Sequence, residues 1–159
     1  MTKILQRNVR LIAQFSVLLC LAAFVVVTAA AADAGRIKVA RGTAEIERGG
    51  ARLPATVGMA VRVGDTVVAG DDGAVGIAFQ DDSLLSIGPN SVLAIDRFVF
   101  DANTHRGEFD ASLKRGTLTA VSGKLVKERP ESMRVNTPAA VMAVRGTQFA
   151  VKVSNFSGK

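Results

Sequence analysis

The chain has 159 residues, a formal net charge of +6, a single cysteine and neither Trp nor Tyr. This length predicts one domain. The basic residues are dispersed among acidic ones, and no aromatic platform accompanies them, so the sequence lacks the basic stripe with stacking aromatics that is typical of nucleic-acid-binding proteins. We therefore expect no nucleic-acid partner.

The first 32 residues differ from the rest. Lys3, Arg7 and Arg10 precede an uncharged stretch, residues 11–32, that ends in small residues. A basic start, an apolar core and a small-residue exit predict a secretory signal peptide over residues 1–32. The competing interpretation is an uncleaved signal anchor, because the uncharged stretch is long enough to span a bilayer. In either case the positive N-terminus stays in the cytoplasm and the remainder crosses the membrane.

From Gly35 onward, short alternating segments are separated by turn residues. The pair Gly49-Gly50 predicts a hairpin, and Val75, Ile77 and Phe79 form one face of the clearest strand. Turns recur at short, regular intervals, which predicts an all-β domain built as a sandwich, a barrel or a β-solenoid. Only residues 124–132 favour a short helical turn, which Pro130 would limit.

Carboxylates gather at the predicted turns, with Asp65, Asp72 and Asp82 as the main candidates. Stacked turns could place such oxygens on one edge, where they would bind calcium. Their spacing matches neither the EF-hand loop nor the glycine-aspartate nonapeptide repeat. We favour the simpler interpretation that each aspartate binds backbone amides of its own turn. We expect no metal and no cofactor.

Residues 134–153, RVNTPAAVMAVRGTQFAVKV, are the stretch around which the domain is organised. Thr137-Pro138 interrupts the alternation, and Arg145 is a cation set against an apolar run beside Gly146 and Thr147. A guanidinium there could receive a carboxylate from a ligand or partner. We favour a structural role, in which Arg145 pairs with a turn aspartate and fastens the last strand. On that interpretation Arg145→Ala would destabilise the domain by about 3–5 kcal/mol.

The string NTPAAVMAVRGTQFAV, together with Gly42 and the segment GMAVRVGDTVVAGDDGAVGIAFQDDSLLSIGPNSVLAID from Gly58 to Asp96, resembles FecR-type domains of the bacterial envelope. The resemblance spans residues 35–153. It implies a β domain over residues 33–153, solenoid-like or sandwich-like, with a C-terminal tail over 154–159. Family members with a transducer role relay transporter occupancy to a sigma factor through a cytoplasmic anti-sigma domain. Only ten residues precede the apolar stretch here, so we expect a stand-alone periplasmic or secreted domain, or one anchored in the inner membrane if the leader stays uncleaved.

The residues for catalysis are sparse. His105 is the only histidine, it falls in a polar loop, and no serine lies in G-x-S-x-G surroundings. We therefore expect a non-catalytic envelope module for interaction or signal sensing, with an envelope protein as partner. The alternative is a structural or glycan-associated envelope protein, which the lack of Trp and Tyr disfavours. The inner membrane is a partner only if residues 1–32 remain attached.

Overall fold

A computed structural model describes residues 32–144 and 146–154. The first half of the β domain contains eight strands, β1 (Asp33–Arg41), β2 (Ala44–Arg48), β3 (Ala51–Pro54), β4 (Ala60–Arg62), β5 (Thr66–Ala69), β6 (Ala74–Phe79), β7 (Leu84–Ile87) and β8 (Val92–Phe100). Most begin or end at the Gly and Asp turns of the sequence. At Gly49-Gly50, both residues adopt positive φ and connect β2 to β3 by a two-residue hairpin turn.

The second half begins with the longest strand and contains both short helices. Its elements are β9 (Gly107–Val121), α2 (Lys124–Glu128), the 3-10 helix η1 (Pro130–Ser132), β10 (Met133–Asn136), β11 (Val141–Ala143) and β12 (Gln148–Val153). The helical turn expected over residues 124–132 is confirmed as α2 and η1, with Pro130 at the start of η1. Among the described residues, no helix is long and apolar enough to cross a membrane.

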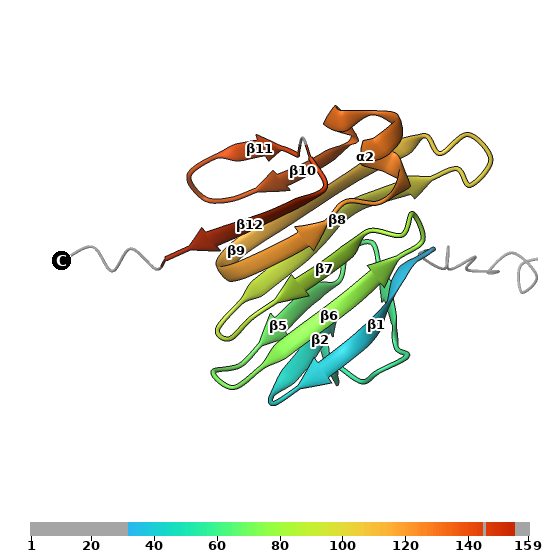
Figure 1. The fold of residues 1–159 in the computed structure, drawn as a ribbon. Coiled ribbons are helices and arrows are strands. Elements are labelled where there is room, and N and C mark those ends of the chain that lie inside the picture. Colours follow the sequence, from blue (N-terminus) through green and yellow to red (C-terminus); the bar gives the residue numbers. More distant parts are fainter. Residues whose placement is uncertain (1–31, 145, 155–159) are drawn as a thin grey trace, which may run out of the picture. The chain divides into compact units, whose positions relative to one another are not determined.

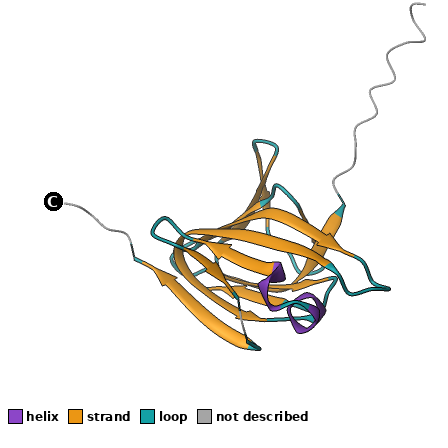
Figure 2. Cartoon of the chain, turned by 90° about the horizontal axis from the view of Figure 1, so that it is seen from above, coloured by secondary structure: helices purple, strands orange, loops and turns teal. Residues whose placement is uncertain are grey.

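The strands form one sheet in the order β3-β2-β5-β8-β9-β7-β6-β1-β4, and β10 and β12 also pair with β9 (Figure 1). All neighbours along this order are antiparallel, whereas β10 runs parallel to β9. The sheet curls around a single core, as the view from above shows (Figure 2).

The curl depends on β9, which belongs to both halves of the sheet. Residues 107–115 pair with β8, and residues 118–121 pair with β7. Between the two parts the buried positions change from odd to even numbers, from Leu113 to Leu118, and the register with β8 shifts. This is a β-bulge, which bends a strand and moves its side chains to the other face. Gly116 follows the bulge at φ +90°.

The two halves face one another across aromatic side chains. Phe79 of β6 lies against Phe109 of β9 with ring centroids 4.5 Å apart, and both contact Phe98 of β8. Phe109 is fully buried, as are Ile37, Ile77 and Leu118. The predicted inward face of β6 is therefore confirmed.

The all-β prediction is thus confirmed. In place of stacked solenoid coils, the described strands make one curled, mainly antiparallel sheet whose halves pack on each other. The strands also differ in length more than the turn spacing suggests, because β9 continues through its bulge for 15 residues.

Candidate binding site

The sheet divides on the outer side of β9, opposite β7 and β8. There β10 pairs with residues 109–112 and is followed by β11, whereas β12 pairs with residues 116–121. The two branches belong to different halves of the curled sheet, and β11 and β12 are both edge strands among the described residues. We call this division of the sheet the fork (Figure 1).

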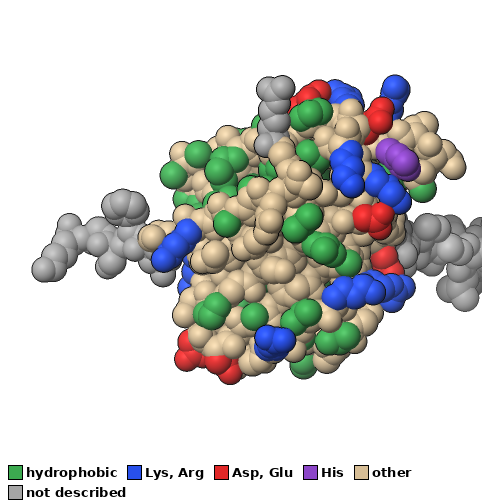
Figure 3. Space-filling model, viewed as in Figure 1, with side chains coloured by type: hydrophobic (Ala, Val, Ile, Leu, Met, Phe, Trp, Pro, Cys, Tyr) green, Lys and Arg blue, Asp and Glu red, His purple; other side chains and the backbone are tan. Residues whose placement is uncertain are grey.

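A groove of about 690 Å³ opens in the fork. The fork groove is lined by Lys114, Thr137, Pro138, Ala139, Met142, Val151, Lys152, Val153 and Ser154. Apolar side chains gather over the β10–β11 hairpin, and cationic atoms lie beside the end of β12 at the left of the view (Figure 3). The groove is therefore apolar with a basic margin.

Two of the predicted site residues shape this groove. Thr137 closes the turn between β10 and β11, because its Oγ1 donates to the Ala140 carbonyl at 2.9 Å and accepts from the Ala140 amide at 3.0 Å. The backbone amide of Thr137 also donates to the Ala140 carbonyl, at 2.8 Å. Pro138 occupies the bend of this turn. The role of Thr137-Pro138 is thus to build one wall of the fork groove.

Gly146 and Thr147 lie at the other end of β12. They line a smaller groove of about 210 Å³ with Ser122 and Lys127, among others. The hydroxyl of Ser122 donates to the Gly146 carbonyl, and its amide donates to the Thr147 carbonyl at 2.9 Å. Gly146 and Thr147 thereby fix the start of β12 against β9. Arg145 lies outside the described residues, so its pairing with a turn aspartate stays a prediction.

The basic margin of the fork groove consists of Lys114, at the β9 bulge, and Lys152, on the exposed face of β12. Among the described residues, no carboxylate lies within 4.0 Å of either ammonium group. Lys124, in contrast, pairs with Asp82. No acidic residue is among the described residues that line the groove. The described charged residues of the groove are therefore all positive.

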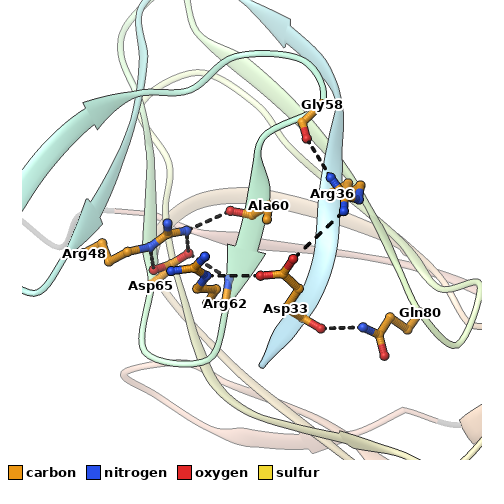
Figure 4. A network of polar contacts seen from close by, with 8 residues as sticks. All are labelled: Asp33, Arg36, Arg48, Gly58, Ala60, Arg62, Asp65 and Gln80. Atoms are coloured by element: carbon orange, nitrogen blue, oxygen red, sulfur yellow. Dashed lines mark hydrogen bonds and ion pairs between the residues drawn. The ribbon is translucent and has the colours of Figure 1, made fainter. Parts of the chain in front are cut away.

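Asp65 has a different role from the other turn aspartates, because it is buried, with 1% of its side chain exposed. Arg48 at the end of β2 binds the Asp65 carboxylate in a bidentate manner. Its Nε lies 2.7 Å from Oδ1, and its Nη2 lies 2.7 Å from Oδ2 (Figure 4). The amide of Arg62 donates to the same carboxylate, and Arg48 donates to the Ala60 carbonyl. The hydrogen bonds and charge of Asp65 raise the pKa of Arg48 above its ordinary value.

The pair joins the two ends of the strand order. Arg48 comes from β2, beside the edge strand β3, whereas Ala60 belongs to the opposite edge strand, β4. Arg62, the last residue of β4, in turn pairs with Asp33 of the neighbouring strand β1, with 3.1 Å between Nε and Oδ1 (Figure 4). Arg48, whose side chain is half-buried, therefore fastens a strand to a turn aspartate, and the separate prediction for Arg145 stays untested.

Sequence reasoning missed Arg48, although a signal existed. Arg48 follows the buried Ile46 by two residues, so its side chain lies on the core-facing side of β2. A cation on a core-facing side requires an acidic partner. The position at a strand end, before Gly49-Gly50, made it resemble an ordinary surface residue of a hairpin.

Asp72 and Asp82 are exposed, and the prediction that each binds amides of its own turn is wrong for both, because their partners are Thr43, between β1 and β2, and Lys124 of α2. The amide of Thr43 donates to Asp72 at 2.9 Å and lowers the pKa of this carboxyl. Lys124 pairs with Asp82 at 2.9 Å and lowers the pKa of Asp82. Asp65, Asp72 and Asp82 do not come together, and the described residues include no cluster of three or more His, Cys, Asp or Glu side chains that could hold a metal ion.

Three polar side chains with catalytic potential are engaged in the fold. His105 stacks on Phe100 with an interplanar angle of 8°. Ser83 donates to Asp81 at 2.6 Å and accepts from the amide of Gly123, which holds the chain at the start of α2. Ser91 accepts from the amide of Thr117 at 2.9 Å, beside the β9 bulge.

Comparison with protein families matches residues 65–158 to the family described as FecR protein. The match covers more than half of the chain, and it includes both branches of the fork together with the residues that line its groove. Strands β1 to β4 precede the matched residues but belong to the same sheet. No curated protein and no solved structure matches the chain.

Proposed function

Because the chain belongs to the FecR protein family, we propose that it is an exported, non-catalytic module of the bacterial envelope that acts by binding another protein. The family is consistent with an envelope module for signal sensing. The observation that carries the proposal is the position of residues 137–142, several of which line an open groove beside β12, an edge strand among the described residues. A segment used only for folding would be expected to lie mainly within the core.

Export is supported by the sequence of residues 1–32, with its basic start, apolar core and small-residue exit. Mass analysis of the N-terminus of the protein from an envelope fraction tests this directly. We expect a chain that starts at Asp33 or Gly35 and is found in the periplasm or outside the cell. An intact Met1 in the inner-membrane fraction would instead identify residues 1–32 as an anchor.

The proposal of binding without catalysis rests on the chemistry of the side chains. His105 is stacked on a phenylalanine, and the buried hydroxyls of Ser83 and Ser91 are engaged with backbone amides and, for Ser83, with Asp81. A nucleophile beside a base is therefore not assembled among these residues. Substrate turnover at enzymatic rates by the purified protein would contradict the proposal.

Partner capture tests the binding role. We expect cross-linking in intact cells, followed by isolation of the protein, to yield a defined envelope protein in constant proportion. A variant in which Thr137, Met142 and Val151 are replaced by alanine should lose this partner while retaining the β-type circular dichroism spectrum. Sedimentation with purified peptidoglycan, without a protein partner, would favour the structural or glycan-associated alternative.

A further inference from the structure

The backbone of β12 has an edge that pairs with no other described strand. The amide of Ser122 donates to the carbonyl of Thr147, and the amide of Gly88 donates to the carbonyl of Thr117 on the other side of β9. Because backbone groups of an antiparallel strand alternate in direction, these two bonds fix the pattern: Phe149 and Val151 bond toward β9. The backbone groups of Gln148, Ala150 and Lys152 therefore point away from the sheet.

The other edges of the sheet are protected. Edge strand β3 carries Arg52 and ends at Pro54, which has no amide hydrogen. Edge strands β4 and β11 have only three residues each. In contrast, β12 extends over six residues without a proline, and Lys152 is its only charged residue. Among the described edges, β12 is thus the one most suited to pair with another strand.

The fork groove adds selectivity to this edge. On the inner face of β12, Val151 and Val153 are half-buried beside Met142 and Pro138. On the margin, Lys114 and Lys152 lack carboxylate partners among the described residues, and no acid lines the groove. A strand added to β12 would therefore place every second side chain against an apolar surface and the others beside lysine ammonium groups.

We infer that the fork groove binds an extended, acidic segment of a protein partner, which adds to β12 as a further antiparallel or parallel strand. This inference rests on the proposed binding function and specifies the chemistry of the partner. The segment alternates apolar residues, which enter the groove, with aspartate or glutamate, which faces Lys152 and Lys114. Main-chain bonds to Gln148, Ala150 and Lys152 supply affinity, and the alternation and charge supply specificity.

A second copy of the chain fits the same edge less well. Pairing of β12 with itself brings a second Lys152 and a second Lys114 to a groove that already lacks acids. An acidic segment instead brings opposite charges, which attract at this partly screened surface. Charge complementarity thus favours an acidic segment over a second copy of the chain.

The test uses a six-residue peptide that alternates valine with glutamate, the full protein as the expressing cell delivers it, and backbone nuclear magnetic resonance. We expect saturable shifts at Val151, Val153 and Met142, and slower hydrogen exchange for the amides of Gln148, Ala150 and Lys152. A peptide that alternates valine with lysine should bind at least about tenfold more weakly. A peptide with the same valines and glutamates in two blocks should also bind more weakly, because its apolar side chains cannot share one face.

Two variants assign the site. Ala150→Pro removes the central outward donor without touching the β9 ladder, and it should abolish peptide binding while the melting temperature stays near that of the wild type. Lys152→Glu should reverse the preference, so that the lysine peptide binds better than the glutamate peptide. Lys38→Glu makes the same change of charge on β1, at a different groove, and should leave the preference unchanged.

Each contrary result has a definite meaning. Equal binding of the two alternating peptides, no peptide binding at millimolar concentration, or protection of the β12 amides by self-association alone would overturn the inference. If cross-linking captures an envelope protein and Ala150→Pro captures it equally well, the proposed function stands and this site is wrong. If the glutamate peptide binds through β12 but no protein partner is found in the envelope, the site stands and the proposed function is wrong.

Discussion

The two margins of the sheet illustrate opposite solutions to the problem of an exposed strand edge. At one margin, the guanidinium of Arg48 in β2 bridges Asp65 and the carbonyl of Ala60 in the edge strand β4. At the fork, β11 and β12 diverge, and the space between them is an apolar groove with two lysines that lack acidic partners among the described residues. The first margin is closed by an ion pair with a buried carboxylate, and the second stays open.

Burial decides what each set of charges does. Asp65 is almost completely removed from water, so its charge requires the three hydrogen bonds that Arg48 and the amide of Arg62 provide. The lysines at the fork are solvated and need no partner for folding. The closed margin should therefore govern stability, and the open margin should govern binding.

The largest effect is expected for Arg48→Ala, which breaks the closed margin. Loss of the guanidinium leaves Asp65 buried and unpaired, and about 3 kcal/mol of unfolding free energy should be lost. We choose the lower end of the range of about 3–5 kcal/mol for buried pairs because 26% of the Arg48 side chain is exposed. Urea denaturation measures this change.

The matched control is Arg52→Ala on the neighbouring strand. Arg52 pairs with Glu47 at 3.0 Å, but 70% of its side chain is exposed, so the loss should be below about 1 kcal/mol. Equal effects of Arg48→Ala and Arg52→Ala would show that burial of Asp65 contributes nothing. In the Arg48→Ala variant, the glutamate peptide should still bind the fork if the protein is assayed well below its melting temperature.

A smaller effect is expected for Gly116→Ala, which alters the point where β9 passes from one half of the sheet to the other. A Cβ at Gly116 would lie 2.1 Å from the Ser91 Oγ and 2.5 Å from its Cα, and the residue has φ +90°. Steric overlap and backbone strain together should lower the unfolding free energy by about 2 kcal/mol. Thermal and urea denaturation can measure it.

The variant Gly50→Ala separates backbone strain from steric overlap as causes of the loss of stability. Gly50 has φ +83°, but its Cβ would meet nothing within 4 Å, so only backbone strain of about 1–2 kcal/mol applies. A Gly116→Ala variant no less stable than Gly50→Ala would mean that the contact with Ser91 relaxes freely. In that case the bend of β9 would not depend on close packing at the bulge.

The sequence predicts individual strands and turns well where a short-range pattern of apolar and turn residues determines them. The inward face of β6, the hairpin at Gly49-Gly50 and the helical turn after residue 123 all follow from short-range patterns, and the structure contains each of them. The path of the sheet does not follow in this way. Whether β9 ends at its bulge or continues into the other half depends on long-range pairing with β7 and β8, which no local pattern encodes.

The candidate site could be predicted only in part. The composition of residues 134–153 directed attention to Thr137, Pro138, Gly146 and Thr147, and these residues do line grooves at the two ends of β12. The lysines of the fork were not predicted, because Lys114 lies in another segment and reaches the groove only through the bend of β9. The pairing of Arg145 with a turn aspartate stays a prediction. The pair between Arg48 and Asp65 was not predicted, because no local pattern ranks the distances between cations and turn aspartates.

The smallest effect is expected for Asp72→Asn, a change at the turn between β5 and β6. Asp72 resembles Asp65 in sequence context, but it is exposed and bonds the amide of Thr43 at 2.9 Å. This bond lowers the pKa of Asp72, so the carboxylate stabilises the folded state above the ordinary aspartate pKa of about 4 and loses that contribution as the pH falls through the lowered value. Asp72→Asn should therefore be slightly less stable than the wild type at pH 7, and the difference should shrink below about pH 4. Paired urea titrations from pH 7 to pH 2 measure the gap, and a gap that stays constant would mean that the Thr43 amide does not distinguish the charged carboxylate from the neutral amide side chain.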